Sequence, residues 1–337
     1  MPLVLLALVG CGSRNDPAPV SESRLLLDTV CTVTLYDPVD QGLVAEALDL
    51  CAEYEALLSR TIEGSDIWRI NNAGGSPVFV DGRTALLLRE ALGFSALSGG
   101  LFDITVGRLC VLWDFTGDPA VPSPDDLALA RGTVDYRQVL IEGAVGAVGT
   151  EVADSVEVRL GNAQAWLDLG GIAKGYIADQ LAAFLKGRGV KSAVIDLGGN
   201  IVTVGKKPNG GNWNIGVNQP FADRSEIIGS ISVGEASIVT SGIYERMFIE
   251  DGTLYHHILD PLSGMPAAGD VVSVTVVSER SMVGDALTTI LVLVGSEGAQ
   301  ALLERVPGVM GAVLVLDSGE LLVYGDIDFT KIEHAGS

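Results

Sequence analysis

Two adjacent histidines, His256 and His257, are the first candidates for acid–base chemistry in a sequence that holds three histidines in all. They lie in the stretch 240–266, TSGIYERMFIEDGTLYHHILDPLSGMP, in an apolar segment predicted to be a strand. Because side chains alternate across a strand, the two imidazoles point to opposite faces. Histidine changes charge near neutral pH, which suits a general base. A structural histidine is the alternative, and the spacing does not choose between the two residues.

Asp285 and Thr289 are candidates for a metal site. They are four residues apart in the segment SMVGDALTTI, which is predicted to be helical, so both side chains project from one face. Two oxygen ligands suit magnesium, which takes the rest of its shell from water and phosphate oxygens. The alternative is an Asp that caps the helix and a Thr that bonds to a backbone carbonyl. Zinc is excluded, because the sequence has three histidines and no C-x-x-C pair.

Two glycine pairs could bring the backbone close to a phosphate. Gly170-Gly171 precedes a predicted helix that carries Lys174 in its first turn, and Gly198-Gly199 follows a predicted strand. A helix start leaves backbone N–H groups free to meet phosphate. Neither pair belongs to a G-x-G-x-x-G or P-loop motif, and a G-x-S-x-G elbow is missing too. Together, the candidate base, the candidate metal pair and these turns indicate an enzyme that catalyses attack on a phosphate ester or pyrophosphate.

The length, composition and charge of the sequence limit the classes of ligand that this protein can bind. The 337 residues, of which 48% are apolar, suffice for one large domain or two ordinary ones. With 43 acidic and 21 basic residues the net charge is -22, which argues against nucleic acid, since its phosphates would be repelled. A phosphorylated ligand therefore needs a metal, backbone amides or a few placed cations such as Lys174 and Arg246.

The N-terminus predicts a membrane anchor. Residues 1–10 are short and apolar, and Leu8-Val9-Gly10-Cys11 resembles a bacterial lipobox, in which the cysteine is lipidated. Residues 13–23 are polar and contain two prolines, as expected of a tether. We therefore expect a leader and tether over residues 1–23 and a folded domain over residues 24–337.

Periodicity predicts the elements that position the candidate residues, and their mixture indicates the α+β class. Alternation predicts one strand at residues 25–36, a polar loop is expected at residues 59–75, and residues 240–242 predict a turn. Helices are predicted at residues 43–58, 84–97, 172–188, 281–294 and 297–305, with a short one starting at residues 123–124. Further strands are predicted at residues 193–197, 213–217, 227–233, 254–259, 271–277, 310–316 and 320–324.

Short motifs along nearly the whole chain after the tether resemble those of the ApbE family, the FAD:protein FMN transferases, including its bacterial periplasmic lipoprotein members. Their order and number make the match specific. They are Asp28-Thr29-Val30, Ser65-Asp66-Ile67, Ile70-Asn71, Phe102-Asp103, Thr105-Val106-Gly107, the run from Asp168 to Gly175 (DLGGIAKG), Leu197-Gly198-Gly199-Asn200, Thr240-Ser241-Gly242, the run HILDP that starts at His257, Gly264-Met265-Pro266, and Asp285 with Thr288-Thr289.

This resemblance implies a single domain related to the T-fold, with mixed, mostly antiparallel sheets and flanking helices. It implies that FAD lies in an extended cleft, that Mg²⁺ is the cofactor, and that AMP leaves while FMN joins a Thr or Ser hydroxyl of an acceptor flavoprotein. His257 matches the catalytic histidine, and Asp285, Thr289 and the Ala173 carbonyl match the metal ligands. The residues matched to the FAD cleft are Asn71, Asp168, Lys174, Gly198, Gly199, Ser241 and Gly242.

The resemblance also implies a location in the cell envelope, with Cys11 anchored to the inner membrane and the domain facing the periplasm. Two other functions fit the same residues. One is an FAD pyrophosphatase, in which water replaces the acceptor hydroxyl, and the other is a lipid-anchored FAD-binding protein without turnover. The joint presence of His257, Asp285 and Thr289 argues against the pure binder. Thr61 stands where some members carry a tyrosine, so no aromatic residue is assigned to flavin stacking.

Overall fold

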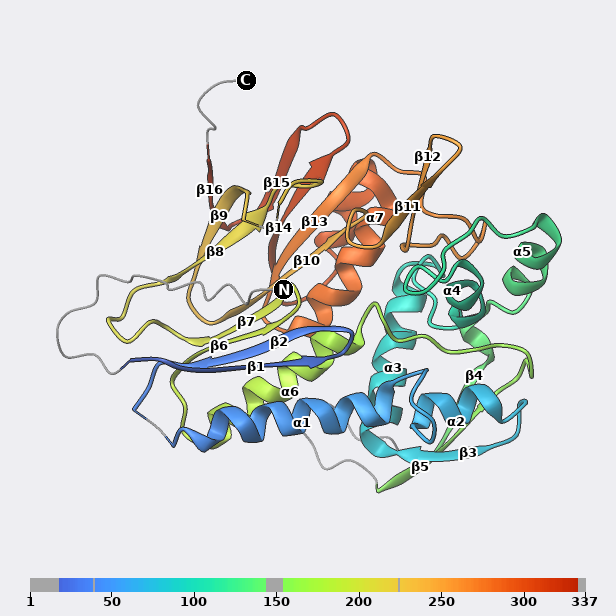
Figure 1. Cartoon of the computed structure of the whole chain (residues 1–337), viewed down its shortest axis with the longest axis horizontal. Helices are drawn as coiled ribbons and strands as arrows, with labels where there is room; N and C mark the ends of the chain where they lie inside the picture. Colours follow the sequence, from blue (N-terminus) through green and yellow to red (C-terminus); the bar gives the residue numbers. More distant parts are fainter. Residues whose placement is uncertain (1–17, 39, 144–153, 224, 333–337) are drawn as a thin grey trace.

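The structure is a computed structural model that describes residues 18–38, 40–143, 154–223 and 225–332. Its largest element is an eight-stranded antiparallel sheet with the order β1-β2-β6-β7-β10-β13-β14-β15 (Figure 1). The strands are β1 Val20–Leu26, β2 Thr29–Leu35, β6 Ser192–Leu197, β7 Asn200–Gly205, β10 Ala236–Gly242, β13 Val271–Ser278, β14 Val309–Leu316 and β15 Leu321–Gly325.

Both faces of this sheet are covered, which explains why all eight residues of β13 are buried. On one face, Val274 and Val276 join a core with the helices α1 (Gly42–Leu58), α6 (Ala173–Gly187) and α7 (Ser281–Leu303). On the other, Val272 and Val277 pack against a three-stranded sheet of β8 (Trp213–Asn218), β9 (Ile227–Val233) and β16 (Asp328–Lys331). Within the described ranges, α7 alone is long and apolar enough to suit a membrane span, but it packs against β10, β13 and α6 as a core helix does.

The remaining elements lie beside this sheet (Figure 1). A second three-stranded sheet, β3-β5-β4, contacts α2 and α3, and a separate hairpin, β11–β12, shares an aromatic cluster with α4. The mostly antiparallel sheets and flanking helices confirm the predicted α+β class. These elements are β3 Val78–Asp81, β4 Val139–Glu142, β5 Ser155–Leu160, β11 Met247–Glu250, β12 Thr253–His256, α2 Asp66–Asn72, α3 Gly82–Leu97, α4 Gly107–Trp113 and α5 Pro124–Arg131.

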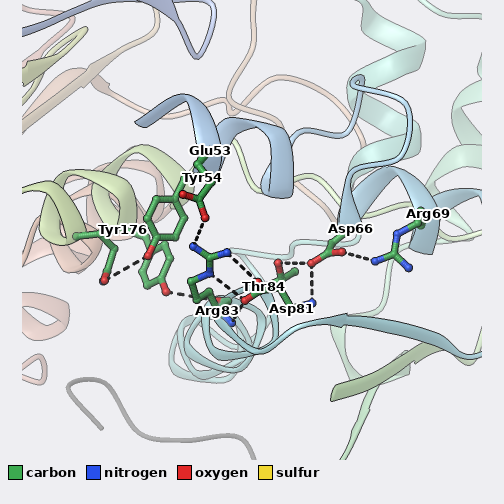
Figure 2. A network of polar contacts seen from close by, with 9 residues as sticks. Glu53, Tyr54, Asp66, Arg69, Asp81, Arg83, Thr84 and Tyr176 are labelled. Atoms are coloured by element: carbon green, nitrogen blue, oxygen red, sulfur yellow. Dashed lines mark hydrogen bonds and ion pairs between the residues drawn. The ribbon is translucent and has the colours of Figure 1, made fainter. Parts of the chain in front are cut away.

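A network of polar side chains ties the first half of α6 to α1 and α3 (Figure 2). The Arg83 guanidinium donates to Asp81 and Glu53 and lies over the ring of Tyr54, 5.2 Å from its centroid. Tyr54 packs edge-on against Tyr176 of α6, whose hydroxyl donates to the Arg83 carbonyl at 3.5 Å. These contacts hold the part of α6 that follows Lys174.

Asp66 is the buried acceptor at the other end of this network. Its carboxylate accepts from the Thr84 hydroxyl at 2.6 Å, from the Asp81 N–H at 2.9 Å and from the Arg69 guanidinium. We expect Asp66→Ala to lower the free energy of unfolding by about 2–4 kcal/mol, because it leaves buried donors without an acceptor. Urea unfolding measures this change, and exposed Asp118→Ala should stay within about 0.5 kcal/mol of the natural protein. Equal stability of the two variants would contradict the expected role of Asp66.

The single strand predicted at residues 25–36 is wrong, because the chain forms the β1–β2 hairpin there. Its turn consists of Leu27 and Asp28, both in the left-handed region with φ of 54° and 56°. The Leu27 N–H donates to Oε1 of Glu55 at 2.8 Å, which fixes this unusual turn. Since β1 begins at Val20, residues 20–23 of the predicted tether belong to the sheet. The predicted lipidation site, Cys11, lies outside the described residues.

Two other local predictions are corrected. Residues 66–72 of the predicted loop form α2, whose N-terminus is capped by Ser65, the acceptor of the Trp68 N–H at 3.0 Å. Residues 240–242 are the end of β10 and pair with β13, where a turn was predicted. The break predicted between the helices at residues 281–294 and 297–305 is confirmed, because α7 is interrupted at Gly295, where φ is 75° and ψ is 178°.

Candidate functional site

The start of α6 and the first turns of α7 approach each other at Gly175. A Cβ at this position would lie 2.3 Å from the Ser281 carbonyl oxygen and 2.7 Å from the Asp285 Cβ, so glycine is required. The close approach lets the Gly175 N–H donate to Oδ2 of Asp285 at 2.8 Å. Asp285 is 2% exposed, and with Oδ2 engaged, Oδ1 is the oxygen left for another partner.

Lys174 lies between Asp285 and Asn200. Its Nζ donates to Oδ1 of Asn200 at 3.1 Å, whereas it is 3.9 Å from Oδ1 of Asp285. The second distance exceeds that of a hydrogen bond, so the interaction is an ion pair without one. The ammonium therefore offsets the buried negative charge while it leaves Asp285 Oδ1 without a hydrogen bond from Lys174.

Thr289 faces the residues just before α6, whereas Asp285 faces the first turn of that helix. A Cβ built on Gly171 would lie 3.2 Å from the Thr289 hydroxyl oxygen, so the two side chains on α7 both point towards residues 171–175, which include Ala173. A carboxylate, a hydroxyl and a backbone carbonyl are hard oxygen donors and suit magnesium. Among the described residues, no three His, Cys, Asp or Glu side chains gather into a metal cluster. A cation here would thus use one carboxylate and complete its shell with neutral oxygens, water or phosphate.

The end of β10 is joined to the same helical turn of α7. The hydroxyls of Ser241 and Thr288 are 2.8 Å apart, and Thr288 also donates to the Asp285 carbonyl at 2.8 Å. Gly242 follows, and a Cβ there would lie 2.3 Å from the Tyr244 ring. Ser241 is therefore placed beside the helical turn that carries Asp285 and Thr289.

The turn between β6 and β7 consists of Gly198 and Gly199, with φ of 64° and 99°. A Cβ on Gly198 would lie 2.2 Å from the Thr29 hydroxyl oxygen, so both the conformation and the space demand glycine. This turn starts β7 at Asn200 and so sets the position of the amide that holds Lys174.

The two histidines differ in burial, but the strand predicted at residues 254–259 is too long: β12 ends at His256, and His257 lies just beyond it. His256 is 4% exposed, and its Nε2 lies 3.1 Å from the Ala267 carbonyl oxygen in the interior. His257 is only half-buried, and its Nδ1 lies 3.3 Å from the Arg246 carbonyl oxygen. A carbonyl only accepts, so Nδ1 of His257 carries the proton and Nε2 holds the free lone pair of a base.

Burial, followed by the charge of Arg246, lowers the pKa of His257 to about 4. The charges of His256 and Lys174 act in the same direction. His257 is therefore neutral at physiological pH and able to accept a proton.

An aromatic cluster holds the segment that follows His257. The indole N–H of Trp113 donates to the Gly264 carbonyl at 2.8 Å, and the ring packs against Tyr255 and Phe248 of the β11–β12 hairpin. The same segment is closed by a hydrogen bond from the Gly264 N–H to the Asp260 carbonyl at 2.7 Å. Residues on both sides of His257 are thus fixed against α4.

The sequence matches the ApbE family over residues 27–314. The chain belongs to the ApbE family. It is 36% identical to the FAD:protein FMN transferase of Treponema pallidum (strain Nichols), over 98% of this chain and 93% of that protein. It is also 36% identical to a Klebsiella pneumoniae (strain 342) protein of the same name, over 86% of this chain and 88% of that protein.

Solved ApbE structures have the same fold. The ApbE protein from Thermotoga maritima superposes with a TM-score of 0.80 at 30% identity, over 91% of this chain and 97% of that one. The flavin transferase ApbE from Vibrio cholerae superposes with a TM-score of 0.78 at 28% identity, over the same shares of the two chains, 91% and 97%. The fold and the family of this protein are therefore those expected from its motifs.

Two of the residues matched to the ApbE cleft bind the protein itself. Asn71, which lies on α2, donates to the Leu167 carbonyl at 2.9 Å and accepts from the Leu167 N–H at 2.6 Å. Asp168 accepts from the Gly170 N–H at 2.7 Å and forms an ion pair with Arg60 at 2.6 Å. Asn71 therefore positions the segment that carries Asp168. Sequence analysis missed Arg60, although it is one of only 21 basic residues in an acidic chain and follows α1 directly.

The ApbE residues that the structure brings together are those on α6, α7, β10 and the β6–β7 turn. A groove of about 280 Å³ elsewhere along α6 and β7 contains none of them. Its lining includes the oppositely charged Lys186 and Glu235, which pair at 2.9 Å. The candidate site is therefore defined by the side chains around Asp285.

Proposed function

We propose that this ApbE-family protein is an FAD:protein FMN transferase that moves FMN from FAD to a Thr or Ser hydroxyl of an acceptor flavoprotein, with Mg²⁺ as cofactor and AMP as the second product. The names of its relatives support the transfer. One observation carries the proposal for this chain: Asp285 and Thr289 both face residues 171–175 of the α6 start, beside Lys174.

The residues around Asp285 fit both the metal and the diphosphate. Oδ1 of Asp285, the Thr289 hydroxyl and the Ala173 carbonyl would hold Mg²⁺, which when bound neutralises negative charge on the diphosphate. Lys174 adds a positive charge at the same place. The Gly170-Gly171 turn leads into the start of α6, but the N–H groups of Gly170, Ile172, Ala173 and Gly175 already donate to acceptors within the protein. The positive charge offered to a diphosphate here is therefore that of Lys174. The overall charge of -22 makes this local positive group necessary for an anionic substrate.

His257 supplies the proton acceptor in this proposal. The acceptor hydroxyl oxygen bonds to the phosphorus of the FMN half, its proton passes to Nε2 of His257, and the bond from that phosphorus to the bridging oxygen breaks. The bridging oxygen leaves with AMP. If water takes the place of the hydroxyl, the products are free FMN and AMP, so exclusion of water decides between transferase and pyrophosphatase.

The pH profile reports on His257. A pKa of about 4 keeps the base neutral, so we expect kcat/KM for transfer to stay level from about pH 8 down to about pH 5. Arg246→Ala removes a charge that lowers this pKa, so it moves the acid limb towards the ordinary value of 6.5. Activity of this variant should fall at about pH 5 and match the natural protein at about pH 8. An acid limb near 6.5 in the natural protein would contradict the assigned environment of His257.

The proposed reaction is tested with FAD, Mg²⁺ and a candidate acceptor domain. AMP release together with an increase in acceptor mass by one FMN supports the transferase. AMP and free FMN without a mass increase indicate the pyrophosphatase. Intact bound FAD indicates the non-catalytic carrier and overturns the proposal. A Ser or Thr to Ala variant of the acceptor serves as the matched control, because it removes the attacking hydroxyl alone.

We also propose that the protein is anchored to the inner membrane through lipidated Cys11 and faces the periplasm. The lipobox-like run Leu8-Val9-Gly10-Cys11 supports this proposal. Expression of Cys11→Ala beside the natural sequence tests it, because only the natural protein should sediment with membranes. Equal sedimentation of both proteins would contradict lipidation at Cys11.

A further inference from the structure

Asn200 is an unusual residue for its position. It is fully buried at the start of β7, on the sheet face that α6 and α7 cover. Its Oδ1 accepts from Lys174 Nζ at 3.1 Å, but its Nδ2 has no partner among the described residues. A buried amide nitrogen without an acceptor is unfavourable. The favourable contact of the Asn200 side chain is therefore the hydrogen bond that its oxygen accepts from Lys174.

The orientation of this amide follows from charge. Exchange of Oδ1 and Nδ2 would point an N–H₂ group at the Lys174 ammonium, and two donors cannot bond each other. Only the observed orientation gives Lys174 an acceptor, so Asn200 and Lys174 form a defined pair.

The alternative acceptor for Lys174 is Oδ1 of Asp285, now 3.9 Å away. Oδ2 of Asp285 is bound by the Gly175 N–H at 2.8 Å, so Oδ1 is the oxygen that a cation can use. A direct hydrogen bond from Lys174 to this oxygen would be charge-assisted and would compete with a metal ion. Asn200 prevents this by holding the ammonium at a longer distance.

We propose that Asn200 is a positioning residue that keeps Lys174 off Asp285 and so leaves Oδ1 of Asp285 open to Mg²⁺. This inference rests on the proposed function, since it takes Asp285 as the metal ligand. It gives Lys174 two roles. The positive charge of Lys174 favours binding of the diphosphate, and its hydrogen bond to Asn200 keeps the ammonium away from the metal site.

Three substitutions separate this role from a merely structural one. Asn200→Leu removes the oxygen and also the unpartnered nitrogen at similar volume, so it is the variant most compatible with folding. Asn200→Asp keeps an oxygen for Lys174. Lys174→Met removes the ammonium that would compete for Asp285, so Asn200→Leu should have no further effect in the Lys174→Met background.

Metal affinity is measured by titration with Mn²⁺, followed through the electron paramagnetic resonance signal of the free ion, and by competition with Mg²⁺. Mn²⁺ suits the same oxygen ligands. We expect Asn200→Leu to weaken metal binding by about tenfold, the effect of one competing charge-assisted hydrogen bond. Asn200→Asp should stay within about threefold of the natural protein, and Lys174→Met should abolish the effect of Asn200→Leu. Thermal melting confirms that each variant is folded.

Two results would overturn the inference: unchanged metal affinity in folded Asn200→Leu, or an equal loss of affinity with and without Lys174. A natural protein that binds no Mn²⁺ or Mg²⁺ would overturn it as well. If the expected affinities are found but FAD yields no AMP, the inference stands and the proposed function fails. The metal titration thus distinguishes the two.

Discussion

Asp285→Ala and Asp285→Asn are expected to slow Mg²⁺-dependent release of AMP from FAD by at least about 10³-fold, because a metal typically supplies several kcal/mol of charge stabilisation. In either variant the carboxylate oxygen Oδ1 is lost as an anionic ligand. The Asn variant can still accept from the Gly175 N–H, which Oδ2 of Asp285 now does at 2.8 Å. The Asn variant therefore separates loss of the metal ligand from loss of the α6–α7 contact.

The measurement is the rate of AMP formation at increasing Mg²⁺ concentration. Asp118→Asn is the matched control, since it changes an exposed carboxylate in the same way, and it should keep the natural rate. Excess Mg²⁺ should not restore either Asp285 variant. Full activity of Asp285→Asn would contradict the assignment of Asp285 as a metal ligand.

His257→Ala should lower the rate of FMN transfer by about 10²–10⁴-fold, which is the usual contribution of a general base. Binding of FAD should change little, because the residues around Lys174 and Asp285 stay in place. The expected result is thus a large fall in kcat with a nearly unchanged dissociation constant for FAD. Transfer is followed by acceptor mass, and binding by quenching of flavin fluorescence.

His256→Gln provides the control for the neighbouring position. His256 is buried and bonds the Ala267 carbonyl, so its replacement should reduce stability while each folded molecule keeps its rate. Natural activity in His257→Ala, or an equal loss of kcat in His256→Gln, would contradict the assignment of the base to His257.

The sequence predicted most periodic elements well, and six of the predicted strands, β6, β8, β9, β13, β14 and β15, begin and end within one residue of their predicted ranges. The helices α1, α3 and α6 begin and end within about two residues of the predicted ranges, the usual scatter of helix boundaries, because their apolar faces repeat over several turns. The β1–β2 hairpin was missed since its turn, Leu27-Asp28, contains neither glycine nor asparagine. The short helix α2 was missed because Asn71, Asn72 and the following glycines suggest a loop, although Ser65 carries the signal of an N-cap.

The site was predicted in part. Helical spacing correctly placed Asp285 and Thr289 on one face, whereas strand alternation could not separate His256 from His257, because β12 ends at His256. Spacing could not reveal that Lys174 and Asn200 meet across α6 and β7, because that contact depends on how the two elements pack. Nor could it show that Asn71 bonds the backbone of Leu167, which is 96 residues away in the sequence.

The ratio of AMP released to acceptor flavinylated tests the central claim most directly. The protein is incubated with FAD, Mg²⁺ and an acceptor domain, AMP is quantified, and the denatured acceptor is weighed by mass spectrometry. A transferase predicts equal amounts of AMP and of acceptor that has gained one FMN by a bond stable to denaturation. Release of AMP with free FMN and an acceptor of unchanged mass would contradict the claim.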